Sequence, residues 1–271
     1  MQTASAFGRV EGALSFFVKA YPQLAEWKSV IERLDNFERN IADTASRRPG
    51  LEVVECSPQR SISAAHLALE KPDNSPLLTI DSLVLAAGET TLVTGRSDMG
   101  KSTLLRVLAS VWPHAQGRIE IPTGARLLVL PQRPYLPEGP LREAITYPRA
   151  SSTNEDRRIA ALLRQVGLYA LVDRIDEEAN WQQRLSLGEQ QRLTIVRAVL
   201  FEPDWLLLDE ATASLDESAE AMVYKLLREE LPRASIVSVG HRSTLLAFHT
   251  RRVHLGLGQV DEAEPMPERA S

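Results

Sequence analysis

A glycine-rich run in the first half of the chain has the residue types and spacing that bind phosphate groups. Its two glycines let the backbone wrap closely around anionic oxygens, which then face the N–H groups of the run and the positive end of the helix after it. Lys101 is expected to neutralise the β- and γ-phosphates of a nucleotide, and the Ser102 hydroxyl to bind Mg²⁺. A glycine turn without a ligand is the alternative, but the apolar strand before the run favours phosphate binding. The run consists of Gly95, Arg96, Ser97, Asp98, Met99, Gly100, Lys101, Ser102 and Thr103.

Two neighbouring carboxylates follow a short apolar segment, residues 205–208. Ligands of open α/β sheets bind at the carboxyl ends of the strands, where Asp209 and Glu210 are placed. We expect Asp209 to hold magnesium, and Glu210 to orient or deprotonate an attacking water. An Asp-Glu pair that simply ends a strand is the alternative. Its place downstream of a phosphate-binding run favours the chemical interpretation.

Alternating strands and helices must position these groups. Apolar strands are predicted at residues 62–69, 77–85, 90–93, 127–130, 205–208, 236–239 and 252–257. Helices are predicted at 101–111, over most of 154–174, at 188–200 and at 217–231. Apolar strands that alternate with helices indicate an α/β fold whose sheet is covered on both faces.

A third motif, residues 185–192, opens the helix predicted from residue 188. Ser186 can cap that helix, and the backbone N–H groups there face an anion. Such a motif adds nothing to an isolated nucleotide site. It makes sense if a second copy of the protein covers the bound nucleotide.

The ordered motifs resemble the ATP-binding cassette (ABC) family, whose members usually read Leu-Ser-Gly-Gly-Gln at the third motif. The resemblance covers about residues 51–260. It implies a P-loop NTPase cassette with a mixed core sheet, an antiparallel β subdomain and a helical subdomain. It also implies ATP and Mg²⁺ as ligands, and ATP hydrolysis as the activity. In the family the third motif of one subunit closes on the γ-phosphate held by the other, which implies nucleotide contacts from Ser186, Leu187, Gly188 and Glu189.

Further residues match the family's motifs. Gln132 matches the Q-loop glutamine, a magnesium and water contact that also senses the transmembrane partner. Residues 214–216 match the D-loop, and His241 matches the switch histidine that contacts the γ-phosphate. The resemblance therefore implies Glu210, His241 and Gln132 as catalytic residues, and Ser102, Asp209 and Gln132 as magnesium ligands.

Three positions depart from the family pattern. Leu187 replaces the middle glycine of the third motif, and Glu189 replaces its glutamine. Lys71, before Pro72, stands where the family often has an aromatic residue that stacks on adenine. We therefore assign no aromatic residue to adenine and expect aliphatic side-chain stems to pack against it.

The variant motifs resemble one group of half-transporters, which includes the peroxisomal acyl-CoA transporters of subfamily D and bacterial peptide and vitamin B12 uptake proteins. In that group the cassette is fused behind a six-helix membrane domain. Residues 1–48 are then expected to be the end of the last membrane helix with its cytosolic extension, 49–260 the ATP-binding domain and 261–271 a disordered tail. The chain would be the C-terminal piece of a longer transporter or a truncated gene product. An independent amphipathic helix packed on the domain is the alternative for the N-terminal helical arm.

The expected partners are a second cassette, as a homodimer or heterodimer, and a transmembrane domain, fused or separate, at the cytoplasmic face of a membrane. A net charge of −5 provides no basic field for nucleic acid, and the single cysteine, Cys56, excludes an internal disulfide. The runner-up is a soluble regulatory or nucleic-acid-linked ABC ATPase, but the interval from Lys101 to Ser186 is short and carries no heptads. A non-hydrolysing binding module would have lost Lys101, Glu210 or His241, and all are present.

Overall fold

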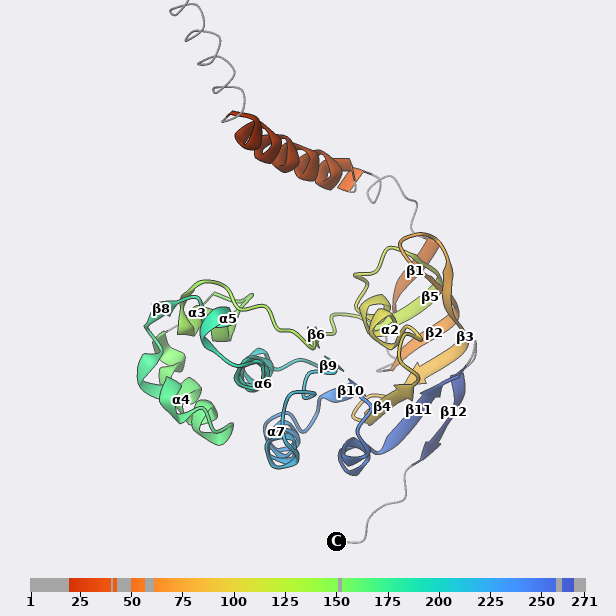
Figure 1. Ribbon diagram of the computed structural model, residues 1–271. Coiled ribbons are helices and arrows are strands. Elements are labelled where there is room, and N and C mark those ends of the chain that lie inside the picture. Colours follow the sequence, from red (N-terminus) through yellow and green to blue (C-terminus); the bar gives the residue numbers. More distant parts are fainter. Residues whose placement is uncertain are drawn as a thin grey trace, which may run out of the picture. The chain divides into compact units, whose positions relative to one another are not determined.

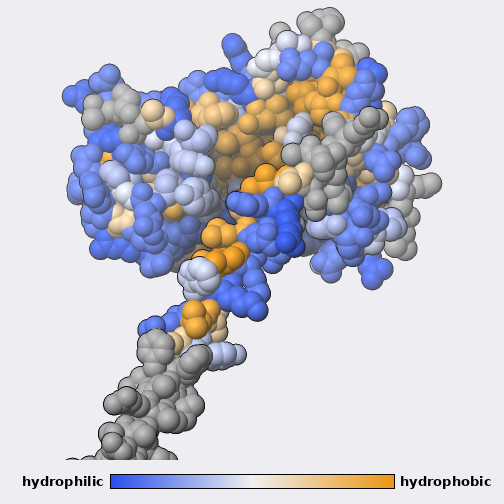
Figure 2. Space-filling view, turned by 90° about the horizontal axis from the view of Figure 1, so that it is seen from above, coloured by the Kyte–Doolittle hydropathy of each residue, from blue (hydrophilic) through white to orange (hydrophobic). Residues whose placement is uncertain are grey.

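The computed structural model describes residues 20–39, 41–42, 50–56, 61–150, 153–256 and 260–265. The chain divides into two units, Met1–Arg48 and Pro49–Ser271. In the first unit, residues 20–39 form a helix with exposed large apolar side chains, among them Leu24, Trp27 and Phe37. Figure 2 shows orange, hydrophobic residues along this part of the chain. The rest of the expected arm, residues 1–19, 40 and 43–48, lies outside the described residues. Among the helices described, none has the length and apolar character needed to cross a membrane.

The second unit contains a four-stranded sheet with the order β1-β5-β2-β3. Its strands are β1 (Gly50–Cys56), β2 (Ile62–Glu70), β3 (Pro76–Leu85) and β5 (Ala115–Pro122). Strand β2 is antiparallel to both β3 and β5, whereas β1 is parallel to β5. Helix α2 (Lys101–Leu108) packs against this sheet through Leu104 and Leu105, which share an apolar cluster with Ile62 and Ile80 (Figure 1).

A six-stranded sheet has the order β12-β11-β4-β10-β9-β6. Its strands are β4 (Thr90–Gly95), β6 (Leu127–Leu130), β9 (Trp205–Asp209), β10 (Ser235–Val239), β11 (Arg251–Leu255) and β12 (Val260–Pro265). All neighbouring strands are parallel except β11 and β12. The expected α/β fold with a mixed core sheet and a largely antiparallel second sheet is confirmed.

Helices cover the sheet and form a separate lobe beside it (Figure 1). The helices are α3 (Leu141–Thr146), α4 (Asp156–Gln165), α5 (Trp181–Arg184), α6 (Leu187–Phe201) and α7 (Glu217–Glu230). Short 3₁₀ helices are η1 (Thr153–Glu155), η2 (Tyr169–Arg174) and η3 (Ser243–Phe248), and β7 (Gly139–Pro140) pairs with β8 (Glu178–Ala179). Helices α3 and α4 contact α6, which lies between this lobe and strand β9 (Figure 1).

Strand β9 shows why the sheet must be covered on both faces. Its residues are all buried, and alternate side chains enter different apolar clusters. Trp205 and Leu207 pack with α2 and the four-stranded sheet, whereas Leu206 and Leu208 pack with the helices on the other face. Since successive side chains of a strand point to opposite faces, a continuous apolar run requires a cover on each.

The structure differs from the sequence prediction at several places, and β5, α3 and α5 are among the elements that were not predicted. The expected helix at 154–174 divides into η1, α4 and η2. Strand β1 was not predicted, because its side chains are mostly exposed and show no apolar alternation. Residues 260–265 form β12 where a disordered tail was predicted from residue 261, since an edge strand pairs through its backbone, whatever its side chains. Residues 266–271 lie outside the described part of the chain.

A buried histidine gives this fold a pH dependence. The ring of His249 contacts the Leu245 carbonyl oxygen at 2.7 Å and the Ser238 hydroxyl at 2.7 Å, and burial lowers its pKa to about 4. The unfolded chain, with a histidine pKa near 6.5, binds this proton more readily, so stability is full above pH 6.5 and falls as the pH drops toward 4. We expect this group to account for a loss of about 3 kcal/mol in the free energy of unfolding.

Urea unfolding of wild type and His249→Gln between pH 7 and pH 4 measures this contribution. The variant is expected to lose less stability than wild type over that range. The exposed-histidine variant His66→Asn serves as the control and is expected to follow wild type. Equal losses in wild type and His249→Gln would contradict the assignment.

Candidate functional site

The candidate site lies where neighbouring parallel strands end together. Leu130 of β6 is level with Leu208 of β9, Asp209 is level with Val239 of β10, and Val239 is level with Val93 of β4. The chain segments that leave these strands therefore start side by side. Those segments carry Gln132, Glu210, His241 and the glycine-rich run, respectively, which is why residues far apart in sequence meet here.

Two glycines of the run are required by the space around them. Gly100 caps α2 with a φ of 84°, and a Cβ there would lie 3.0 Å from the Leu77 side chain. Gly95 has a φ of 149°, and a Cβ there would lie 2.7 Å from the Leu255 carbonyl oxygen. Only glycine accommodates both the backbone conformation and the close approach. The run is therefore held against β3 and β11 in a tight turn.

Lys101 lies at the first position of α2 with its ammonium group folded under the run. Its Nζ donates to the carbonyl oxygens of Gly95 at 3.0 Å and Arg96 at 2.7 Å, and the residue is buried. Burial lowers the pKa of Lys101, while the nearby carboxylates of Glu210, Asp98 and Asp209 oppose that shift. An anion above the run would supply the charge that this buried cation needs.

Ser102 and Asp209 form a compact oxygen pair. The Ser102 hydroxyl donates to Asp209 Oδ1 at 2.5 Å, and burial raises the pKa of the Asp209 carboxyl. A bound cation would stabilise this desolvated carboxylate beside the hydroxyl. Because Mg²⁺ prefers oxygen ligands and uses one or two carboxylates together with phosphate oxygens, this pair fits a magnesium ion bound with a nucleotide.

The Glu210 carboxylate is held from two sides. Gln132 Nε2 donates to its Oε2 at 2.9 Å, and His241 Nε2 lies 3.1 Å from its Oε1. The residue adopts a left-handed backbone conformation, with φ 51°, and its amide nitrogen donates to the Val239 carbonyl oxygen at 3.1 Å. A strained conformation that neighbouring contacts maintain is typical of a functional position. The arrangement leaves a carboxylate oriented to accept a proton.

These groups share one cavity of about 580 Å³, a volume that suits a nucleotide-sized ligand. Its lining includes Ser97, Asp98, Gly100, Lys101, Ser102 and Thr103 of the run, together with Gln132, Glu210 and His241. Gly95, Arg96 and Met99 are not part of the lining, although the first two hold Lys101 through their carbonyl oxygens. Asp209 lies behind Ser102 and reaches the site through that hydroxyl.

The residues of the third motif do not line this cavity. Ser186 caps α6 in a capping box, with its hydroxyl accepting from Glu189 N at 3.3 Å and its amide donating to Glu189 Oε2 at 2.9 Å. Hydrogen bonds from the Ser186 side chain and backbone lower the pKa of Glu189. Leu187 is exposed beside them. Within one chain the predicted site residues thus fall into two groups.

The sequence reasoning missed an aromatic residue in the cavity. Trp112 lines it together with Lys71, Pro72 and Leu77, none of which belongs to the glycine-rich run. Its indole N–H donates to the Glu70 carbonyl oxygen at 3.1 Å, which fixes the ring beside the β2–β3 turn. Trp112 follows α2 rather than preceding the glycine-rich run, so only a search beyond that helix would have found it.

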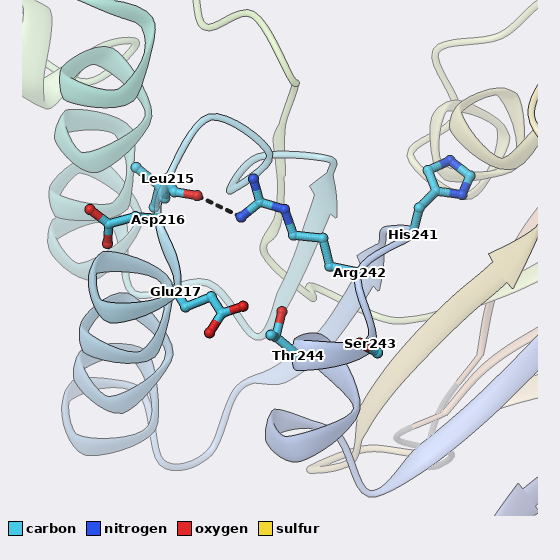
Figure 3. Close-up of a pocket in the computed structure, with 7 residues that line it drawn as sticks. All are labelled: Leu215, Asp216, Glu217, His241, Arg242, Ser243 and Thr244. Carbon is cyan, nitrogen blue, oxygen red and sulfur yellow. Dashed lines mark hydrogen bonds between the residues drawn. The ribbon is translucent and has the colours of Figure 1, made fainter.

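A second missed residue is Arg242, which follows His241. Figure 3 shows its side chain reaching the carbonyl oxygen of Leu215, while the neighbouring His241 side chain points away from that pair. The guanidinium donates to the carbonyl oxygens of Leu215 at 2.5 Å and Ala213 at 2.7 Å. The loop at 213–216 is therefore fastened to the segment that carries His241.

The chain is similar in sequence to several known proteins. The model of the family described as ABC transporter matches residues 78–213. The chain is 40% identical over 190 residues to an uncharacterized ABC transporter ATP-binding protein of Haemophilus influenzae, covering 70% of this chain and 32% of that protein. It is 34% identical over 227 residues to the lysosomal cobalamin transporter ABCD4 of Mus musculus, covering 78% of this chain and 37% of that protein.

One solved structure, a bacterial Atm1-family ABC exporter with ATP bound, superposes with a TM-score of 0.69 at 23% identity. The match covers 79% of this chain and 40% of the exporter chain, and it shows a common fold. The chain spans only about a third of the length of the Haemophilus influenzae protein and somewhat more of ABCD4.

Proposed function

Because this chain belongs to the ABC transporter family, whose ATP-binding domains are ATPases coupled to transport, we propose that its cavity binds and hydrolyses ATP to power movement of a solute across a membrane. The observation that carries the proposal is the convergence of Lys101, Ser102, Gln132, Glu210 and His241 on one cavity. The lining of this cavity includes both a buried cation and an oriented carboxylate, as phosphoryl transfer to water requires.

In the proposed reaction Lys101 and the backbone N–H groups of the glycine-rich run bind the β- and γ-phosphates. A water oxygen forms a bond to the γ-phosphorus, the bond to the bridging oxygen of ADP breaks, and Glu210 accepts a proton from the water. Gln132 and His241 orient Glu210 through its two carboxylate oxygens. Ser102 and Asp209 would hold Mg²⁺, which supplies charge stabilisation to the phosphate oxygens.

The two groups of site residues support a dimeric arrangement. Ser186, Leu187, Gly188 and Glu189 lie outside the cavity of their own chain, at the start of α6, where N–H groups and the helix dipole favour an anion. A second cassette, identical or related, would place these residues over the nucleotide held by the first. ATP then stabilises the closed dimer because it binds that state better than the open one.

The proposed partner for transport is a membrane domain, either fused to the cassette or carried on another chain, at the cytoplasmic face of a membrane. The family membership and the similarity to longer transporter proteins support this proposal. Dimer closure driven by ATP would change the conformation of the membrane domain, and hydrolysis would reset it.

Phosphate release by the purified chain at increasing protein concentration tests the proposal. If two cassettes form each active site, turnover per chain is expected to rise with protein concentration and to reach a plateau. Equilibrium dialysis with radiolabelled ATP measures binding under the same conditions. A chain that binds no ATP, or one that binds ATP yet shows no hydrolysis at any concentration, would contradict the proposal.

Trp112 is expected to bind the nucleobase. With the phosphates at Lys101, the base must contact lining residues outside the glycine-rich run, and Trp112 offers a large aromatic ring there. Since stacking on an aromatic ring contributes about 1–3 kcal/mol per base, Trp112→Ala is expected to weaken ATP binding about tenfold. Competition assays with ATP and inorganic tripolyphosphate separate base from phosphate contacts, because only ATP affinity should fall. The control Trp27→Ala, at an exposed position of the N-terminal helix, is expected to change neither affinity. Equal losses of affinity for ATP and tripolyphosphate in Trp112→Ala would refute the base contact.

A further inference from the structure

We infer that Gln191 is a positioning residue that ties the start of helix α6 to the reactive carboxylate. Gln191 is fully buried on α6, between two loops of the site. Its Nε2 donates to the backbone carbonyl oxygen of Gln132 at 2.9 Å, and its Oε1 accepts from the backbone N–H of Ser214 at 3.0 Å. One amide group thus joins the loop after β6 to the loop after β9.

Both loops lead from Gln191 to the same carboxylate. Along the first route, the Gln132 side chain donates to Glu210 Oε2 at 2.9 Å. Along the second, Ser214 lies between Ala213 and Leu215, whose carbonyl oxygens accept hydrogen bonds from Arg242. The residue before Arg242 is His241, which contacts Glu210 Oε1 at 3.1 Å. The contacts therefore close a ring that begins at Gln191 and ends on the two oxygens of Glu210.

A buried carboxylate reinforces the second route. Glu220 of α7 is 1% exposed and accepts hydrogen bonds from the hydroxyls of Thr212 at 2.8 Å and Thr244 at 2.6 Å. Thr212 precedes the loop at 213–216, and Thr244 follows Arg242 by two residues. Glu220 therefore links the same two chain segments that Arg242 links, through Thr212 on one and Thr244 on the other. They are expected to move together rather than independently.

The side-chain amide of Gln191 favours one arrangement of the two loops that it contacts. A buried amide without hydrogen-bond partners costs free energy, and Gln191 satisfies both of its ends only when the two loops lie where they do. Gln191 lies about 1.4 turns after Ser186, the residue that caps the same helix. Any displacement of the third motif by the partner cassette is therefore passed to the contacts around Glu210. This inference rests on the proposed ATP hydrolysis.

The substitution Gln191→Leu removes both hydrogen bonds and keeps the side chain buried. It is expected to lower kcat for ATP hydrolysis about 10- to 100-fold, because small misplacement of a catalytic group has effects of that size. Affinity for ATP is expected to stay within about twofold, since Gln191 does not line the cavity. Steady-state phosphate release gives kcat and KM, and equilibrium dialysis gives the affinity.

The neighbouring Gln190 offers a matched control. It is also buried on α6, but its Nε2 donates to the carbonyl oxygens of Gln182 and Leu185, both at 2.8 Å, and makes no contact in the ring. Gln190→Leu makes the same chemical change and is expected to reduce stability comparably in urea unfolding, yet to leave kcat within about threefold of wild type. Equal kcat losses in the two variants would assign Gln191 a merely structural role and overturn the inference.

Arg242→Met breaks the ring at a second place and keeps the test informative if Gln191→Leu folds poorly, because the Arg242 side chain is 41% exposed. Arg242→Met is expected to lower kcat about tenfold with ATP affinity retained, whereas Arg157→Met, at an exposed position of α4, is expected to behave as wild type. Since the two residues act in one ring, the loss in the double variant is expected to be smaller than the product of the single losses.

Independent, multiplicative losses, or a Gln191→Leu protein with wild-type kcat, would overturn the inference. If wild type itself binds no ATP or hydrolyses none, the proposed function fails instead, so the two failures are distinguishable.

Discussion

Glu210→Gln is expected to lower ATP turnover by about 10²- to 10⁴-fold while ATP remains bound, because the amide cannot take up the proton of the attacking water. Glutamine has nearly the same shape as glutamate, so the contacts with Gln132 and His241 around the side chain are disturbed little. With hydrolysis blocked, the dimer that has closed around ATP does not return to its open state. The variant is therefore expected to accumulate as a dimer with ATP.

Two measurements check this result. Phosphate release gives the turnover, and size-exclusion chromatography with light scattering, with and without ATP, gives the oligomeric state. Glu178→Gln makes the same change at an exposed position of β8 and is expected to hydrolyse ATP as wild type does. A Glu210→Gln protein with near-normal hydrolysis would show that another group accepts the proton.

Lys101→Met is expected to weaken ATP binding at least about 100-fold. The ammonium group is buried under the glycine-rich run, where the pKa of Lys101 is lowered by desolvation and where it donates to the Gly95 and Arg96 carbonyl oxygens. Among the residues described as lining the cavity, the other cationic side chain belongs to Lys71, which lies outside the glycine-rich run. Without Lys101 the phosphate charges lose their compensating cation, and charge-assisted hydrogen bonds to them are lost.

Equilibrium dialysis with ATP measures the loss directly, and urea unfolding checks that Lys101→Met is folded. Lys225→Met, which removes an exposed ammonium group on α7, serves as the control and is expected to bind ATP as wild type does. Binding within about threefold of wild type in Lys101→Met would place the phosphates elsewhere and would refute the proposed site. The two predictions differ in kind, because Glu210→Gln separates hydrolysis from binding whereas Lys101→Met removes binding itself.

The sequence by itself determined the family, the α/β fold class and the motifs of the site. A glycine-rich run ending in Lys101 and Ser102 is a local feature, since its backbone conformation depends on residues adjacent in sequence. The apolar strand before Asp209 and the cap at Ser186 are likewise local, and both were recognisable as patterns. The predicted resemblance to subfamily D transporters is confirmed by the similarity to ABCD4. The assignments of individual site residues stay predictions that the variants above test.

Only the tertiary structure decided which side chains meet. Strand register at the carboxyl edge of the six-stranded sheet brings Gln132 and His241 to the two oxygens of Glu210, and no pattern within either loop specifies that contact. The position of Trp112 in the cavity depends on how α2 packs against the β2–β3 turn. The ring through Gln191 depends on a buried amide that reads in sequence as one more polar residue of a helix. Local propensity acts over a few residues, whereas these contacts arise from packing between segments far apart in the chain. The sequence therefore indicated which residues belong to the site, and only the tertiary structure determined which of them are in contact.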